Sequence, residues 1–190
     1  MLGLNKPFLV RYFDWVLGCL RGDFGISYVN PARTVAGELA RCLPATLQLA
    51  AASFVIVLVL SIPIGFLCAV YKDQWFDKLM RGLVFVTTAM PAYWVGLLLM
   101  WLVSVKLGLL PTNGSGTFRH LILPAFTVAL SYISTYIRLI RNNMLENMKQ
   151  DYVLYANVRG LPQQSIWVKH VLKNSMHTCI VAMGMSIPQM

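Results

Sequence analysis

The sequence has few charged residues. Asp, Glu, Lys and Arg make up only 12% of its 190 residues, about half the share in a typical soluble domain, whereas 57% are hydrophobic. From Leu43 to Tyr71 no residue is charged. A helix of that length is long enough to cross the ~30 Å hydrocarbon core of a bilayer at ~1.5 Å per residue. The composition excludes an ordinary soluble domain and predicts a membrane protein.

Short motifs of common hydrolases and ATPases are also missing. The sequence has no glycine-rich phosphate loop ending in Lys-Ser or Lys-Thr, no G-x-S-x-G and no H-E-x-x-H. The expected spans contain no carboxylate, which leaves an intramembrane aspartyl protease or an acid-based proton relay unsupported. We therefore predict that the chain is not an enzyme and binds no cofactor. If ATP hydrolysis powers it, partner chains must bind the ATP and Mg²⁺.

The four cysteines form neither a CxxC metal pair nor a recognisable disulfide framework. Cys19 and Cys42 share the N-terminal segment, where pairing stays open, while Cys68 and Cys179 lie in apolar runs. His177 and Cys179 are candidate nickel ligands by chemistry. They are two residues apart, so on a helix they point in different directions. We expect anchoring and packing, and no metal site.

Apolar runs predict an all-α, polytopic transmembrane bundle. The expected spans are residues 45–71, 82–105 and 121–137, and a fourth, 175–190, that the sequence cuts short. Pro63 and Gly65 predict a kink or local unwinding in the first span. The net charge of +9 comes from Lys and Arg at span edges, a pattern of membrane anchoring and not of nucleic-acid binding. Loops 72–81 and 138–174 share one side and hold nine of the sixteen basic residues, which places them in the cytoplasm.

Residues 1–44 form an outer amphipathic segment in which we expect no membrane span. Val10, Phe13, Leu17 and Leu20 recur at helical spacing, which predicts a helix lying on the membrane surface. Gly22 and Gly25 flank Asp23 and mark a turn, in which Asp23 is a turn or cap residue.

A polar stretch, residues 151–175, separates the third and fourth apolar runs. Tyr152, Ala156 and Gly160 recur at intervals of four and so share one helical face. Gly160, followed by Leu161 and Pro162, predicts a helix stop with a left-handed glycine. A second helix should follow, whose apolar set is Ile166, Val168, Val171 and Leu172. The stretch predicts a helix–glycine turn–helix at a membrane surface; alone, it is also compatible with an ordinary amphipathic loop on lipid.

This stretch resembles the cytoplasmic coupling loop of ABC-importer permeases, in the branch that carries peptides, nickel and opine metallophores. HLILPA at residues 120–125 and GDFGIS at residues 22–27 resemble the same family. In it, a short helix docks into a cleft of an ATPase subunit and transmits movement. The resemblance assigns this coupling role to eight residues: Asp151, Tyr152, Ala156, Arg159, Gly160, Leu161, His170 and Asn174.

The resemblance also implies partners and a location. Members pair with a second permease, two ATPase subunits and an extracytoplasmic substrate-binding protein in the bacterial cytoplasmic membrane, surrounded by lipid. Complete members have one more helix before the part that corresponds to this sequence and two more at its end, so we expect the sequence to be a fragment. His177-Thr178 stands where the family usually has Leu-Pro, which puts the start of the fourth span in question.

Cargo and pathway are the least specified features. Resemblance favours nickel or a nickel–metallophore chelate over dipeptides and oligopeptides. Pro91, Tyr93 and Trp94 could line a pathway, although aromatic residues in spans more often pack or face lipid. Two other classes remain: a structural membrane subunit that does not transport, and a secondary transporter driven by an ion gradient. Co-purification of an ATPase subunit would separate the ATP-driven importer from these two classes.

Overall fold

The computed structural model describes residues 7–28, 30–114 and 116–189. Its regular elements in these ranges are helices, apart from an isolated antiparallel bridge between Ile26 and Thr34. The α-helices are α1 (Phe8–Leu20), α2 (Val35–Val70), α3 (Trp75–Ala89), α4 (Ala92–Leu99), α5 (Phe118–Asn147), α6 (Asp151–Val158), α7 (Gln163–Ser165) and α8 (Lys173–Ser186). Two π-helices, η1 (Met100–Lys106) and η2 (Ile166–Leu172), and a 3₁₀ helix, η3 (Ile187–Gln189), complete the set. The predicted all-α class is confirmed.

The chain divides into two compact units, Met1–Gln48 and Leu49–Met190, and the boundary lies within α2. In the first unit, α1 forms where the amphipathic helix was predicted, and its apolar side chains are exposed, Phe13 by 60% and Leu20 by 79%. Gly22 and Gly25 have positive φ, and the Gly25 N–H donates to Asp23 Oδ1 at 2.9 Å. The predicted turn role of Asp23 is confirmed. Cys19 and Cys42 are free thiols.

The first expected span belongs to a longer helix. α2 begins at Val35, ten residues before the expected start, and so takes in part of the segment expected to lie outside the membrane. It continues as α-helix through Pro63 and Gly65, so the predicted local unwinding is wrong. Gly65 serves a close helix contact instead, because a Cβ atom there would lie 2.9 Å from Ile140 Cβ on α5.

The second expected span, residues 82–105, is not one continuous helix. α3 begins at Trp75, within the expected loop, and ends at Ala89. After Met90 and Pro91 in extended conformation, α4 and η1 continue at 104° to α3. Pro91 causes the break because it forces the preceding residue out of helical conformation. Among the described residues, α2 and α5 are long and apolar enough to span a membrane, and the bent pair makes a third candidate.

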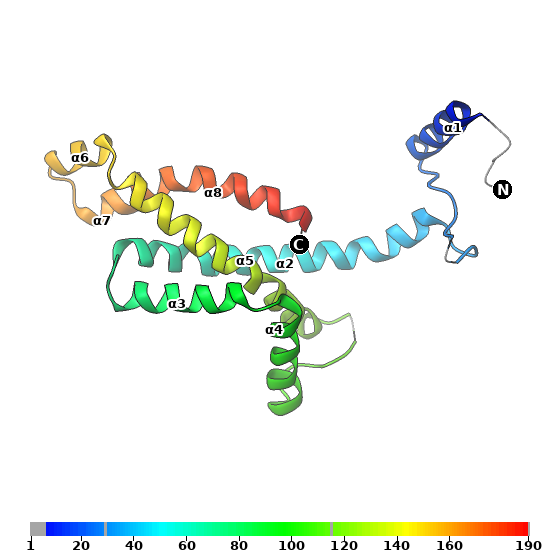
Figure 1. Cartoon of the computed structure of the whole chain (residues 1–190), viewed down its shortest axis with the longest axis horizontal. Coiled ribbons are helices and arrows are strands. Elements are labelled where there is room, and N and C mark those ends of the chain that lie inside the picture. Colours follow the sequence, from blue (N-terminus) through cyan, green and yellow to red (C-terminus); the bar gives the residue numbers. More distant parts are fainter. Residues whose placement is uncertain (1–6, 29, 115, 190) are drawn as a thin grey trace. The chain divides into compact units, whose positions relative to one another are not determined.

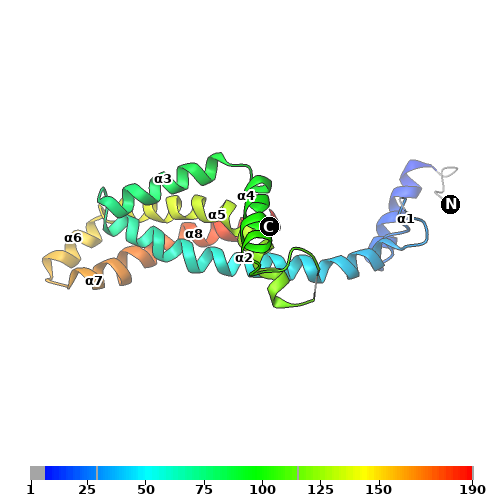
Figure 2. The ribbon, with the colours of Figure 1, turned by 90° about the horizontal axis from the view of Figure 1, so that it is seen from below.

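α5 is the central helix of the second unit. It contacts α3, α4, α8 and η2, runs through Pro124, and continues past the expected span end at residue 137 to Asn147. Ile140 and Met144 of α5 are fully buried, as are Ile166 and Val171 of η2. Figures 1 and 2 show α3 and α8 beside α5, with α6 and α7 at the end of the unit where α2 turns into α3. The two loops predicted to share one side therefore lie at one end of this unit.

The fourth apolar run also begins earlier than expected. η2 starts at Ile166 and leads directly into α8, which ends at Ser186. The Tyr136 hydroxyl of α5 donates to the Ala182 carbonyl at 3.2 Å and shares a hydrogen bond of 2.6 Å with Ser186 Oγ. These bonds fix α8 against α5.

Candidate functional site

The junction between α5 and α6 is held by side-chain hydrogen bonds. α5 ends at Asn147, and α6 begins at Asp151 after three turn residues. The Tyr152 hydroxyl donates to Asn147 Oδ1 at 2.8 Å, and Asn147 Nδ2 donates to the Asn143 carbonyl at 2.9 Å. The first turn of α6 is thereby tied to the last turn of α5.

α6 ends in the turn that the sequence predicted. Gly160 has φ +74°, and its N–H donates to the Asn157 carbonyl at 2.9 Å. The Leu161 N–H donates to the Ala156 carbonyl at 3.3 Å. This pair of bonds is a Schellman motif, which needs a left-handed residue at the glycine position. No atom lies within 4 Å of where a Cβ of Gly160 would be, so the backbone alone requires glycine.

α6 has one buried face and one exposed face. Val153 and Ala156 are only 6% and 4% exposed, and the helix packs on η2. On the other face Leu154, Tyr155 and Val158 are exposed by 65%, 65% and 78%. α6 therefore presents an apolar outer surface, defined by these three residues, while its inner face fixes it to the bundle.

The eight residues assigned to coupling occupy different positions. Ala156 is buried, and Tyr152 and His170 are half-buried, whereas the other five are exposed: Asp151, Arg159, Gly160, Leu161 and Asn174. The guanidinium of Arg159 lies over the Tyr155 ring, 5.6 Å from its centroid. α6 and its turn bring together the residues from Asp151 to Leu161, while His170 lies on η2 and Asn174 on α8.

Sequence reasoning missed the outer surface of α6. Within α6 it selected the exposed Asp151 at the start, and Tyr152 and Ala156, whose shared face turns inward. The apolar residues Leu154, Tyr155 and Val158 carried a signal, since they lie outside the helical face of Tyr152 and Ala156, and apolar residues on a second face indicate a second contact surface.

The other predicted positions do not come together into a site. Pro91 lies at the α3–α4 break; Tyr93 is 72% and Trp94 43% exposed. The sulfur of Cys179 is buried, and His177 is exposed with Nδ1 3.3 Å from the Asn174 carbonyl oxygen. Within the described ranges, no cluster of three or more His, Cys, Asp or Glu side chains suits a metal ion.

A buried ion pair lies near the same end of the unit. Arg141 of α5 donates from Nε and Nη2 to the two carboxylate oxygens of Asp77 on α3, each at 2.7 Å. The Asp77 side chain is fully buried, and Arg141 is 13% exposed. Sequence reasoning placed Asp77 in a loop and so missed it.

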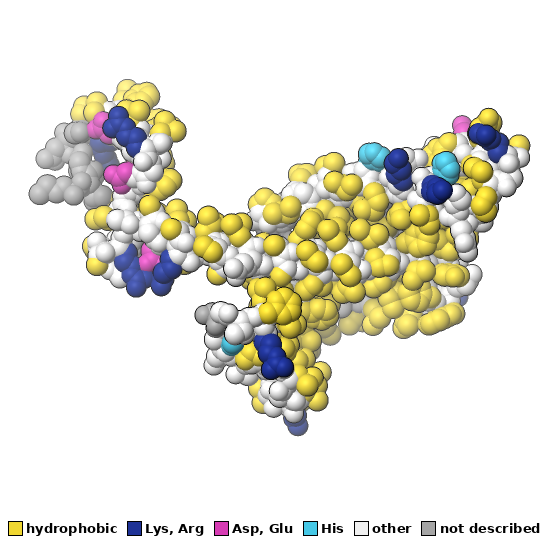
Figure 3. Space-filling model, turned by 180° about the vertical axis from the view of Figure 1, so that it is seen from behind, with side chains coloured by type: hydrophobic (Ala, Val, Ile, Leu, Met, Phe, Trp, Pro, Cys, Tyr) yellow, Lys and Arg dark blue, Asp and Glu magenta, His cyan; other side chains and the backbone are white. Residues whose placement is uncertain are grey.

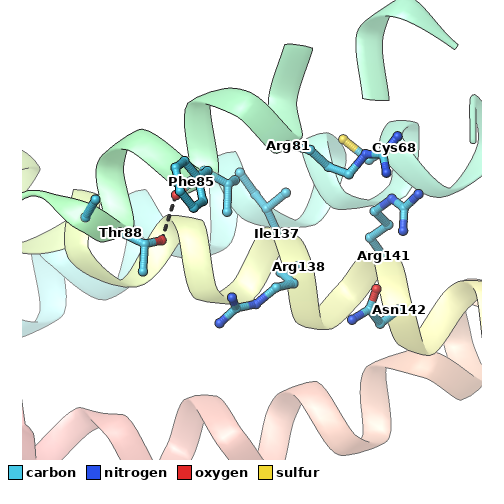
Figure 4. Close-up of a pocket in the computed structure, with 10 residues that line it drawn as sticks. Cys68, Arg81, Phe85, Thr88, Ile137, Arg138, Arg141 and Asn142 are labelled. Atoms are coloured by element: carbon cyan, nitrogen blue, oxygen red, sulfur yellow. Dashed lines mark hydrogen bonds between the residues drawn. The ribbon is translucent and has the colours of Figure 1, made fainter. Parts of the chain in front are cut away.

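A cavity of about 540 Å³ adjoins the ion pair between α3 and α5. Its lining combines apolar side chains such as Val84 and Phe85 with Arg81, Arg138 and Arg141. In Figure 4, Arg141 points towards Arg81 and Cys68, whereas Arg138 points away from them. Figure 3 shows mainly hydrophobic side chains over the middle of the second unit, with Lys, Arg and His side chains near the end that bears α6 and α7.

Comparisons with known proteins agree with this architecture. Residues 61–190 match the family model described as the inner membrane component of binding-protein-dependent transport systems. The metal-staphylopine import system permease protein CntB of Staphylococcus aureus is 34% identical over 98% of this chain and 59% of its own length. The oligopeptide transport system permease protein AppB of Bacillus subtilis is 35% identical over 98% of this chain and 62% of its own length.

A third relative is the glutathione transport system permease protein GsiC of Salmonella typhimurium, 33% identical over 97% of this chain and 60% of its own length. The chain thus spans about three fifths of the length of the relatives it matches. The match to the family model and these identities over nearly the whole chain confirm the resemblance seen in the sequence. The chain belongs to the inner membrane components of binding-protein-dependent transport systems, the permease family of ABC importers.

Proposed function

We propose that this chain works as a permease subunit of an ATP-driven importer, and that α6 receives the movement of an ATPase subunit. The observation that carries the proposal is the exposed apolar surface of Leu154, Tyr155 and Val158 on a helix at one end of the bundle. Lipid does not account well for this surface, because exposed Asp151 and Arg159 flank it on the same short helix. A cleft on a water-soluble ATPase subunit fits both the apolar centre and the charged edge.

The inner face of α6 supports the mechanical part of the proposal. Val153 and Ala156 pack against the bundle, and Tyr152 is bonded to Asn147 of α5. A push on the outer surface is therefore delivered to α5 and η2 and not absorbed in a loose loop. The excess of Lys and Arg in the loops at this end supports a cytoplasmic location.

Photo-cross-linking tests the proposed docking. A photoreactive phenylalanine analogue replaces Val158 in the complete transporter, and cross-linked products are identified by mass spectrometry. We expect a product with the ATPase subunit. Leu109, 62% exposed in the loop after η1, serves as the matched control and should give none. An ATPase product at Leu109 but not at Val158 would overturn the proposal.

For the cargo we propose a small metal chelate, with nickel as the metal, handed over by an extracytoplasmic binding protein. A relative named for metal-staphylopine import supports the chelate. The lack of a metal cluster among the described residues favours a chelated over a bare metal ion. A short peptide is the second candidate, because the relatives named for oligopeptide and glutathione transport are similar to the same degree.

Uptake measurements separate the two cargoes. Cells with the complete transporter, and cells lacking this subunit, receive labelled nickel with and without a small chelator, and separately a dipeptide as nitrogen source. Subunit-dependent nickel uptake that rises with the chelator supports the chelate. Nickel uptake independent of the subunit, together with subunit-dependent growth on the dipeptide, would establish the peptide instead.

A further inference from the structure

The buried pair of Asp77 and Arg141 joins two parts of the fold that are far apart in the sequence. Asp77 lies in the first turn of α3 and Arg141 in the last third of α5. Both carboxylate oxygens accept a bond from the same guanidinium. A bidentate pair of this kind fixes orientation as well as distance. Inside a membrane the hydrophobic effect does not drive helices together, so packing and polar bonds between helices decide how they are held.

The carboxylate also closes the turn between α2 and α3. Asp77 Oδ2 accepts the backbone N–H of Asp73 at 2.9 Å, and Asp73 has φ +61°. The Nη2 atom of Arg81 lies 3.6 Å from Asp77 Oδ2 and 3.3 Å from Asp73 Oδ1. One buried carboxylate thus holds the turn, the start of α3 and α5 together.

α5 connects this pair to α6 without a flexible joint. Between Arg141 and the end of α5 the chain stays helical, and Met144 is fully buried. The bond between Tyr152 and Asn147 then joins α5 to α6. The bond of Tyr152 to Asn147 thus joins α6 to α5, and the Asp77–Arg141 pair joins α5 to the turn between α2 and α3.

We infer that the Asp77–Arg141 ion pair is the link that passes movement of α6, through α5, to the start of α3 and the turn between α2 and α3. Both are positioning residues, acting through the helices they hold. The inference rests on the proposed coupling function of α6. Breaking the pair leaves the buried Asp77 carboxylate with only the more distant guanidinium of Arg81, 3.6 Å from Oδ2, and this loss is unfavourable, so α3 follows α5 while the bidentate pair is intact.

The test follows the transmitted movement directly and needs no cargo. The complete transporter is placed in lipid nanodiscs, its native cysteines are replaced by alanine, and Trp75→Cys is introduced at the start of α3, where the side chain is 73% exposed. The rate of labelling by a fluorescent maleimide is compared without nucleotide and after trapping with MgATP and vanadate. With the ion pair intact, we expect trapping to change the rate by at least about fivefold, the lower end of usual coupling between sites.

Three variants remove or alter the link. Asp77→Asn keeps an oxygen for the Asp73 N–H and loses the charge; Arg141→Lys keeps the charge and loses the bidentate geometry. The double variant Asp77→Asn with Arg141→Gln leaves no buried charge and so guards against misfolding of the single variants. We expect all three to trap nucleotide as the parent does but to lose the change in labelling. Arg138→Gln, on an exposed residue one turn earlier in α5, should retain it.

The outcomes separate this inference from the coupling proposal. If the Val158 cross-link to the ATPase forms in every variant and trapping still changes the labelling of Trp75→Cys, the ion pair is only structural and the inference is wrong. No change in labelling with the pair intact would also overturn it, because movement would then not reach α3. A missing Val158 cross-link in the parent would instead refute the coupling proposal on which it rests.

Discussion

The hydroxyl of Tyr152 and the side-chain oxygen of Asn147 lie 2.8 Å apart, so the first turn of α6 is bonded to the last turn of α5. Tyr152→Phe removes this bond and leaves the ring in place. We expect a loss of about 1 kcal/mol in stability, the usual net contribution of one hydrogen bond. Uptake by the complete transporter should fall with it, since α6 is held less firmly. Tyr28→Phe, at a side chain 81% exposed, is the control and should change neither quantity.

Gly160→Val tests the left-handed turn after α6. The φ of +74° costs a branched residue about 1–2 kcal/mol, and relief of this strain re-aims the helix. Uptake should fall while membrane insertion, measured by protease protection, stays normal. Gly160→Asn should retain more uptake because asparagine tolerates this conformation.

Gly82→Val is the matched control for Gly160→Val. Gly82 also has no atom within 4 Å of a built Cβ, but it lies inside α3 without a positive φ. Equal losses of uptake at the two glycines would contradict a role for the left-handed turn.

Gly65→Ala tests the contact between α2 and α5. The added methyl group would lie 2.9 Å from Ile140 Cβ, so one helix must shift. Overpacking of this kind costs about 1–3 kcal/mol. The thermal unfolding temperature of the purified transporter should drop. Neither Ile140→Val nor Ile140→Ala should restore it, because both keep the Cβ atom that the added methyl group meets first, and truncation of the fully buried Ile140 leaves a cavity as well.

Cysteine labelling tests the sidedness of the chain. In a background without native cysteines, Thr112→Cys should react with an impermeant thiol reagent in intact cells, and Lys149→Cys should react only after permeabilisation. Both residues are exposed, so accessibility within the fold does not distinguish them. The reverse pattern would place α6 outside the cell, where it could not meet an ATPase subunit, and would refute the coupling proposal.

Local features of this chain could be predicted well from the sequence. The turn at Gly160 depends on neighbouring residues only, because glycine, leucine and proline in succession stop a helix wherever they occur. The turn around Asp23 has the same local origin. The fold class followed from the apolar runs and the family from the motif residues, because neither prediction needs to know how the helices pack.

Features that depend on distant contacts could not be predicted. The sequence alone assigns Asp77 to a loop, because its partner Arg141 is 64 positions away and only the fold brings the two together. Proline shows the same limit: Pro124 lies within α5 and Pro63 within α2, yet Pro91 ends a helix. Which face of α6 turns inward likewise depends on η2, so periodicity alone could not select its outer surface.

The break at Pro91 determines what can surround this part of the molecule. From Trp75 to Ala89 α3 is ~21 Å long at ~1.5 Å per residue, which puts the break well inside a ~30 Å hydrocarbon core if α3 begins at its edge. The Trp94 and Val95 N–H groups donate to the Pro91 carbonyl, but the last carbonyls of α3 and the first two N–H groups of α4 have no partner within their own helix. Hydrocarbon chains offer none either. Fatty acyl chains are therefore excluded from the break, and protein or water must occupy the space beside it.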